Sequence, residues 1–234
     1  MIKIENVEVM GWEAAIRGMR NPMNSWDKSD SYFIDRDGDM YDICGNHAPF
    51  YGDDNGNGDS IGKNDLDLMT RLRNAGTDHR KFMRMITVYF DITGPMYWWK
   101  QMDCYSVGKV QNSCSTMHKI AAKEFTLDEF SHEHLFKDDE MQTNTDVLQF
   151  VIDALNFARA DYLKTNDKRY WWQMIQLLPS SYNQRRTVML NYEVLANIYK
   201  SRRNHKLDEW HIFCDWIETL PYSQLITGIE NKED

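Results

Sequence analysis

Apolar and polar side chains alternate along residues 85–92, and this period of two predicts a β-strand with one buried face. The apolar set consists of Ile86, Val88, Phe90 and Ile92. Thr93-Gly94 is expected to break the strand, and Pro95 suits the first turn of a helix because its missing N–H costs nothing there. We expect this strand to organise the rest of the chain.

The helix predicted after Pro95 has a bulky apolar surface and should end near residues 106–108. Its large side chains are Tyr97, Trp98, Trp99 and Met102. The next segment, KVQNSCSTMHK at 109–119, is small, polar and rich in groups that can bind a ligand. A strand, a buried helix and a polar loop, in this order, commonly place a binding site on a rigid support.

The chain before the central strand begins with an imperfect alternation over residues 2–10, which predicts an opening strand, and a short helix over 11–19. Residues 26–64 then differ in composition, because they are rich in Asp and Gly. Within them, residues 32–43 predict a hairpin that turns at Asp37-Gly38, and residues 47–64 are expected to form a loop or lid.

Three acidic residues of this hairpin invite a calcium-site interpretation: Asp35, Asp37 and Asp39. However, Gly38 lies between these acids rather than after the third, and no Glu closes the loop at the required distance. A solvated hairpin without a metal is therefore the favoured interpretation.

Apolar stripes that step by three and four residues predict helices through most of the remaining chain. The first covers residues 65–75 and is expected to be capped by Asn64 or Asp65, and Ser180-Ser181 is expected to cap a later one. The expected C-terminal helices are 148–162, 167–178, 182–203 and 208–219. The predicted fold class is α+β: one domain over residues 1–234, with a small mixed or antiparallel sheet and a helical majority.

The composition excludes some partners. The 234 residues carry a formal net charge of −9, which argues against duplex DNA or an anionic membrane as a general partner but allows small anionic ligands. The four cysteines are widely spaced without a Cys-x-x-Cys pair, so free thiols in a reducing cytosol are favoured over a metal site. No apolar run approaches the length of a membrane span, and we expect a cytoplasmic protein.

Residues 112–118 form the first candidate site, because they offer several hydroxyls, an amide and a backbone turn. An ordinary polar loop or helix cap is the alternative. Ser115 and His118 are close in sequence, but no acid is positioned to complete a catalytic triad. The chain also lacks a glycine-rich phosphate loop and a dinucleotide fingerprint.

A second candidate site lies in residues 180–206, where six basic residues accompany the single acid Glu193. The basic residues are Arg185, Arg186, Lys200, Arg202, Arg203 and Lys206. On the helix predicted here, Asn191 and Arg202 share a face about 16 Å apart, which suits the two ends of a nucleotide. A solvated basic face is the alternative.

These features follow one another, over about residues 65–220, in an order that resembles flavin-dependent thymidylate synthases. The Arg-His-Arg that opens the family's ligand motif corresponds here to residues 104–107 (CYSV), so the chain resembles a diverged member. The positions that carry the resemblance are Gly76, Phe82, Gly94-Pro95, Lys100-Gln101, Asn112, Ser115, Leu178-Pro179, Asn191, Leu195 and Arg202.

The resemblance implies reductive methylation of dUMP, or a related pyrimidine nucleotide, with FAD, methylene-tetrahydrofolate and NADPH. It also implies a homotetramer with sites at the subunit junctions. The candidate nucleotide-binding residues are Asn112, Ser113, Ser115, Asn191 and Arg202, with Arg185 and Arg186 as replacement phosphate ligands. The candidate flavin-binding residues are His79, Arg84, Gln101, Ser106 and Lys109.

Two other functions fit the same residues. The first is a non-catalytic nucleotide- or flavin-binding protein on this scaffold. The second is a single-strand nucleic-acid binder that uses the basic segment and exposed aromatic residues, although the net charge of −9 argues against it.

Overall fold

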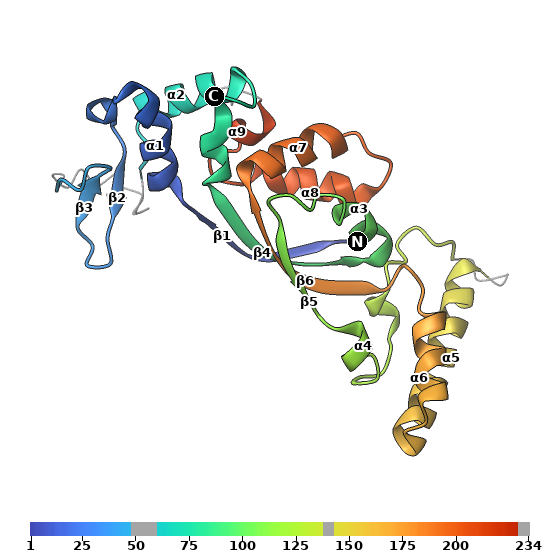
Figure 1. Cartoon of the computed structure of the whole chain (residues 1–234). Coiled ribbons are helices and arrows are strands. Elements are labelled where there is room, and N and C mark those ends of the chain that lie inside the picture. The colour runs from blue at the N-terminus through green and yellow to red at the C-terminus, as the bar shows by residue number, and fades with distance from the viewer. Residues whose placement is uncertain (48–59, 138–142, 229–234) are drawn as a thin grey trace.

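A four-stranded antiparallel sheet forms the centre of the computed structural model, which describes residues 1–47, 60–137 and 143–228. The order of its strands is β1 (Lys3–Met10), β4 (Thr87–Pro95), β6 (Asn183–Asn191) and β5 (Val110–Ser113), as Figure 1 shows. The sheet and a helical majority confirm the predicted α+β class, and β1 and β4 lie where strands were expected.

The central strand β4 is longer than predicted. Its apolar residues Val88, Phe90 and Ile92 are buried on one face, as the alternation required. However, Thr93-Gly94 does not break the strand, because β6 continues to pair with β4 as far as Pro95, opposite Asn183. Pro95 ends the strand, where its missing N–H removes little from the ladder.

The helix predicted over residues 182–203 is wrong in its first half. Residues 183–191 form β6, in which Gln184, Arg186, Val188 and Leu190 are buried while Arg185 and Thr187 are exposed. This alternation of two, together with partners on both sides of the strand, overrides the helical pattern. Helix α7 (Tyr192–Arg202) starts only after β6, and its cap is Asn191 rather than Ser180-Ser181, because the Asn191 side chain accepts a hydrogen bond from the Val194 amide.

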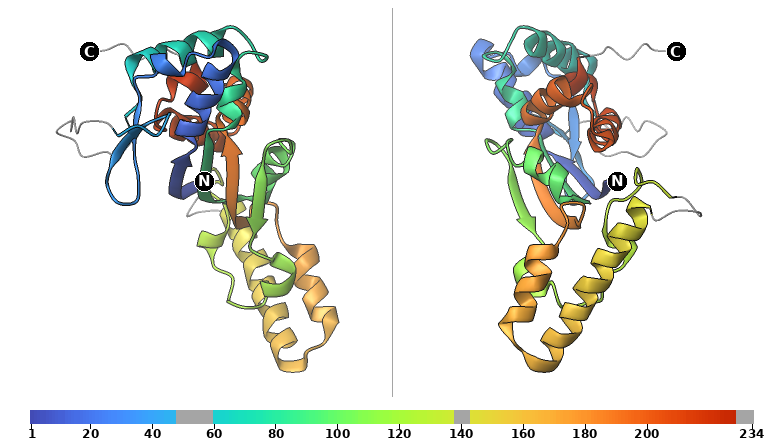
Figure 2. Two further views of the ribbon diagram at one scale, coloured as in Figure 1. Left: turned by 60° about the vertical axis from the view of Figure 1, so that its left-hand side comes forward. Right: turned by 90° about the vertical axis from the view of Figure 1, so that its right-hand side faces the viewer.

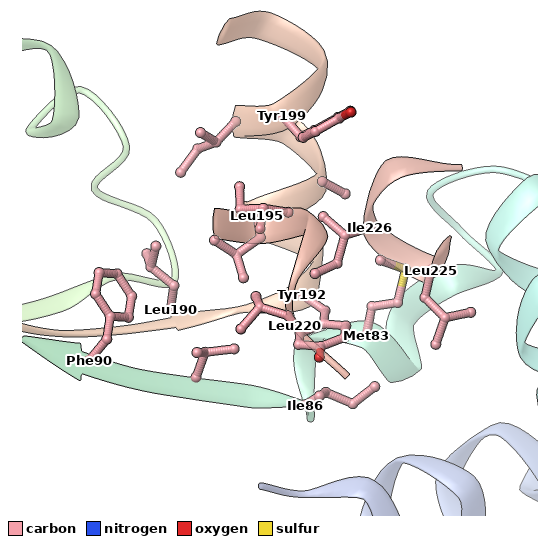
Figure 3. Packing of buried hydrophobic residues seen from close by; sticks show 14 of the residues in the cluster. Met83, Ile86, Phe90, Leu190, Tyr192, Leu195, Tyr199, Leu220, Leu225 and Ile226 are labelled. Atoms are coloured by element: carbon pink, nitrogen blue, oxygen red, sulfur yellow. The ribbon is translucent and has the colours of Figure 1, made fainter. Parts of the chain in front are cut away.

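Helices cover the apolar face of the sheet (Figure 1). They include α1 (Trp12–Arg20), α3 (Met96–Met102), α7, α8 (Asp208–Glu218) and α9 (Gln224–Thr227). Figure 3 shows Phe90 and Leu190 of the sheet below Leu195 of α7, with Leu225 and Ile226 of α9 beside them. Helix α3 ends at Met102, earlier than predicted, and the expected polar loop after it contains β5 and the short helix α4 (Thr116–Lys119).

Helices α5 (Asn144–Thr165) and α6 (Lys168–Leu177) form an arm that projects from the sheet (Figure 2). They confirm the helices predicted at 148–162 and 167–178. The arm has its own small core, in which Leu148, Leu155 and Met174 are buried with Phe125 and Phe130 of the preceding segment. Among the described helices, none is both long enough and apolar enough to span a bilayer.

The predicted hairpin is present as β2 (Tyr32–Ile34) and β3 (Met40–Asp42). In the described part of the chain, no group of three or more His, Cys, Asp and Glu residues is placed to hold a metal ion. Most of the loop or lid predicted at 47–64, residues 48–59, lies outside the described residues.

Helix α2 (Lys63–Asn74) has a different cap from the one predicted. Neither Asn64 nor Asp65 caps it; instead, the Asp30 carboxylate accepts hydrogen bonds from the Asn64 and Asp65 amides at 2.9 and 3.1 Å. The Asp65 side chain is fully buried and accepts a hydrogen bond from Arg20 Nε at 2.6 Å. Arg20 also donates to the carbonyls of Ser25 and Lys28, so this ion pair fixes the chain between α1 and the hairpin against α2.

Removing one partner of this buried pair should destabilise the fold strongly. We expect Asp65→Ala to lower the free energy of unfolding by about 3–5 kcal/mol, because Arg20 would keep an uncompensated buried charge. The control is Arg17→Ala, which breaks an exposed pair with Glu13 on α1 and should cost only about 0.3–0.5 kcal/mol. Urea unfolding measures both, and equal losses in the two variants would contradict the expectation.

Candidate functional site

The turn at Cys114-Ser115-Thr116, between β5 and α4, borders two cavities. The inner cavity has a volume of about 500 Å³ and is also lined by Ser113, Arg186 and apolar side chains of α6. The outer cavity has a volume of about 630 Å³ and is also lined by Arg185 and by Lys119 of α4. The first candidate site of the sequence, residues 112–118, therefore lies between two cavities at its middle residues 114–116.

The register of β5 on β6 divides the candidate residues between the two faces of the sheet. Asn112 lies opposite Thr187, and Ser113 lies opposite Arg186. Directly paired residues of antiparallel strands point to the same face of the sheet. Ser113 therefore shares the face of the buried Arg186, which we call the inner face, while Asn112 shares the opposite, outer face with the exposed Thr187. The structure thus brings Ser113, Ser115 and Arg186 together, and it separates them from Asn112.

Arg186 is the buried cation of the inner cavity, and its side chain is 8% exposed. Its guanidinium lies over the Trp99 ring, 4.1 Å from the centroid, and donates hydrogen bonds to Gln184 Oε1 at 3.0 Å and to Asp103 Oδ1 at 2.8 Å. These contacts hold the planar group in one orientation, as recognition of an anion or a pyrimidine carbonyl requires.

Gln184 is a residue that the sequence analysis missed. Its amide donates to the Cys114 carbonyl at 2.9 Å and to Thr116 Oγ1 at 3.2 Å, so it fixes the turn between the cavities. Its carbonyl oxygen orients Arg186. The sequence carries no local signal for its inward direction, because residues 184–190 (QRRTVML) do not alternate between polar and apolar types and only their burial in the strand alternates.

Ser115 also fits the alternative of a helix cap, because its hydroxyl accepts a hydrogen bond from the His118 amide at 3.2 Å. The same hydroxyl borders both cavities, so the two roles do not exclude each other. His118 is exposed and lines neither cavity.

On the outer face, the charge of Arg185 is balanced by an acid. Its guanidinium contacts the Asp91 carboxylate at 2.8 Å. Hydrogen bonds from Thr187, Arg185 and Asn6 hold the pKa of Asp91 well below its usual range. Lys123 of the outer cavity is likewise paired, with Glu129. These pairs leave Lys119 as a cation of that cavity for which the described residues provide no ion pair.

Asn191 and Arg202 lie at opposite ends of α7 rather than within one long helix. Asn191 is used as a helix cap, and it is packed so closely against Gly108 that a Cβ there would lie 3.0 Å from Asn191 Nδ2. Gly108 also has a φ of +76°, a conformation that favours glycine. Asn191 therefore has a structural role at the start of α7.

Arg202 has neutral partners. It donates hydrogen bonds to the Tyr105 hydroxyl at 2.8 Å and to Gln101 Oε1 at 3.2 Å, and its guanidinium lies 4.9 Å from the Trp210 ring centroid. Within the described part of the chain it contacts no carboxylate, so its positive charge is not balanced. Arg186 contacts Asp103 and Arg202 contacts Tyr105, and both partners lie in the segment that connects α3 to β5.

The candidate flavin-binding residues lie outside the inner and the outer cavity. Three of them are exposed. His79 precedes the 3₁₀ helix Arg80–Arg84, Arg84 ends that helix, and Ser106 lies in the loop before β5. The side-chain oxygen of Gln101 is occupied by Arg202 and Trp210. Lys109 is 4% exposed and is tied to the Met102 carbonyl and to Asp103. None of these five residues lines the inner or the outer cavity, so those two cavities are built from other side chains.

Asp103 connects this segment to the sheet, because its Oδ1 accepts from Gln111, Lys109 and Arg186 at 2.8–3.2 Å. Partial burial raises the pKa of Asp103, but hydrogen bonds from Gln111 and Lys109 and the charge of Arg186 outweigh this, so the net pKa lies below the usual 3.8. A carboxyl whose pKa is lowered by folding contributes stability above its unfolded pKa and loses it as the pH falls through the folded value.

We therefore expect the stabilisation from Asp103 to be complete above about pH 5 and to disappear as the pH falls below its usual pKa of 3.8. Asp103→Asn should lower the free energy of unfolding by about 1–2 kcal/mol at pH 7 and much less at pH 3. Guanidinium unfolding at both values measures the difference. A loss that is the same at both pH values would show that the carboxylate does not contribute through its charge.

No protein-family model matches the sequence, and no curated protein matches it. Solved structures are similar along the whole chain. The crystal structure of flavin-dependent thymidylate synthase ThyX from Helicobacter pylori, complexed with FAD and dUMP, covers 97% of this chain and 98% of its own, with a TM-score of 0.65 and 17% identity.

A second similar structure is the UMP/dUMP methylase PolB from Streptomyces cacaoi bound with 5-Br UMP. It covers 94% of this chain and 88% of its own, with a TM-score of 0.53 and 13% identity. At such identities the likeness concerns the fold alone, and this chain has the fold of these two proteins.

Proposed function

We propose that this chain is a diverged flavin-dependent thymidylate synthase-like enzyme that methylates dUMP or a related pyrimidine nucleotide. The main support is the full-length similarity of its fold to ThyX, whose crystal structure is complexed with FAD and dUMP. The inner cavity adds a second support, because hydroxyls, an amide and an oriented arginine meet there beside apolar side chains.

In this proposal the inner cavity holds the pyrimidine. The hydroxyls of Ser113 and Ser115 and the guanidinium of Arg186 supply hydrogen-bonding groups, while Ile175 and Leu178 exclude water from one side. Arg202 is the better candidate for the phosphate, because its charge is unbalanced whereas Arg186 shares its charge with Asp103. Arg185 pairs with Asp91 on the other face of the sheet, so it is a weaker candidate than Arg202 for binding the phosphate.

FAD is the proposed cofactor, with methylene-tetrahydrofolate and NADPH as co-substrates; a bound flavin would supply the hydride. We propose that a homotetramer completes the flavin site at a subunit junction, since none of the candidate flavin-binding residues lines the inner or the outer cavity. One face of α5 is available for such a junction: Val147, Phe150 and Phe157 are 52%, 73% and 72% exposed and step by three and seven residues along one side of the helix.

A non-catalytic nucleotide- or flavin-binding protein on this scaffold is the second candidate. Arg185, Arg186 and Lys109 each form an ion pair with an aspartate. These pairs favour the second candidate, because cations neutralised within the chain have less charge to offer to a substrate or a flavin. Titration with FAD tests the enzyme: unchanged flavin fluorescence would favour the non-catalytic protein, and where FAD binds, an assay of dUMP methylation separates the enzyme from a non-catalytic flavin-binding protein. Single-strand nucleic-acid binding has less support, because Arg185 and Arg186 point to opposite faces of the sheet and the basic segment does not form one strip.

The role of Arg202 can be tested by ligand stabilisation. We expect dUMP at a hundredfold excess over its Kd to stabilise the wild-type protein by about 2.7 kcal/mol, and we expect this gain to vanish in Arg202→Ala. The variant itself should lose about 1–2 kcal/mol, because it lacks the Tyr105 hydrogen bond and the contact with Trp210.

Thermal unfolding with and without dUMP measures both effects. Arg71→Ala, which removes an exposed arginine from α2, is the control and should keep the full dUMP shift. Equal shifts in wild type and Arg202→Ala would exclude Arg202 as a nucleotide ligand, and no shift in any protein would contradict the nucleotide site.

The oligomeric state gives a separate test. We expect light scattering to show a tetramer at micromolar concentration, and Phe150→Ser combined with Phe157→Ser to dissociate it without loss of helical circular dichroism. Leu163→Ser removes another exposed apolar residue from a different side of α5 and should leave the assembly intact. A wild-type monomer would remove the shared-site proposal.

A further inference from the structure

A basic pocket of about 600 Å³ lies between the C-terminal ends of α2, α7 and α9 and the 3₁₀ helix that starts at Arg80. Four cationic side chains line it: Arg73, Arg80, Lys200 and Arg203. No acidic side chain is among the described residues that line it, although the whole chain carries a net charge of −9. The pocket thus concentrates positive charge on an acidic protein.

This pocket is separate from the candidate nucleotide site. Figure 1 shows α2, α9 and α7 above the sheet, and α4 and α6, which border the inner cavity, below it. The two cavities share no lining residue. The inference below therefore does not depend on the proposed function.

Acidic partners neutralise the positive charge of some of these four cations but not of all. Arg80 pairs with Glu193 at 2.8 Å, and Arg203 pairs with Asp215 and Glu218 behind the pocket. Arg73 donates only to neutral oxygens, at 3.0–3.2 Å: the carbonyls of two α9 residues and the amide of Asn74. For Lys200 the described residues provide no ion pair. Among the described residues, the positive charges of Arg73 and Lys200 are therefore not balanced by a carboxylate.

Stabilisation of helix ends accounts for part of this arrangement. Cations in the last turn of a helix interact favourably with its dipole, and Arg73 caps carbonyls of α9. Stabilisation of a helix end can explain a single cation, but it does not require four cations to border the same cavity. Burial, and then repulsion by Arg80, lowers the pKa of Arg73, and an anion bound between the two arginines would relieve this repulsion.

We propose that the basic pocket binds a small oligophosphate, either free or as the phosphate chain of a nucleotide. Guanidinium and ammonium groups are the strongest phosphate ligands among side chains, and four of them across 600 Å³ suit more than one phosphate. Asn197 and Thr77 add a neutral amide and a hydroxyl. Tyr199, the aromatic residue of the lining, is only 8% exposed and offers no open face for a base, so the phosphates are the recognised part.

The experiment titrates the full chain with inorganic tripolyphosphate in a calorimeter at low ionic strength. We expect saturable binding that weakens as salt is added. Lys200→Glu should weaken it about tenfold or more, because it removes a charge-assisted hydrogen bond and adds a repulsive charge. Lys164→Glu is the matched control: Lys164 also lies in the last turn of a helix, α5, and the net charge changes equally, but it is distant from the pocket.

Three outcomes would overturn the proposal: no binding to the wild type, equal weakening in the two lysine variants, or binding of sulfate as tight as that of tripolyphosphate, which would show an adventitious ion only. Arg73→Gln gives a second test on another element, with binding weakened about tenfold in the folded variant. Titration with ATP identifies the source: an affinity equal to that of tripolyphosphate supports recognition of the phosphates alone, and a tighter one supports a nucleotide.

Discussion

The antiparallel pairing of β4 with β6 is the interaction on which the rest of this structure depends. It joins nine residue pairs, from Thr87 opposite Asn191 to Pro95 opposite Asn183. Each strand leads directly into a helix, β4 into α3 and β6 into α7, so the register fixes where both helices start. It also places Trp99 of α3 against β6, where its indole N–H donates to the Gln184 carbonyl at 2.9 Å. The orientation of Arg186 over Trp99 follows from that register.

Charge compensation is the second constraint, because buried ions cost several kcal/mol unless they are paired. Arg20 and Arg186 are buried, and each has a carboxylate partner. Arg73 and Arg202 are partly buried, but their hydrogen bonds go to neutral groups. An arginine of this kind keeps its charge and gains most from an anionic ligand. The two arginines mark the two places where we propose that phosphate binds.

The arm formed by α5 and α6 shows how one domain can contain two cores. Its small core is closed by residues 120–130 and by Tyr182, just before β6, and it is separate from the main core under the sheet. Helix α5 therefore uses one apolar stripe for its own packing and exposes another. Such a helix is stable within the chain and still has a surface at which a second copy would pack in the proposed tetramer.

The sequence by itself determined the fold class, the central strand, the arm helices and the hairpin, because their periodicity and turn residues are local signals. It also directed attention to Ser113, Ser115 and Arg202. Only the tertiary structure decided that residues 183–191 form a strand, since their partners β4 and β5 are distant in the chain and no local pattern records them. The same long-range pairing separated Arg185 from Arg186, turned Asn191 into a helix cap and brought Gln184 and Asp103 to Arg186. Adjacent residues of a strand point to opposite faces, so a helix interpretation could not have placed them.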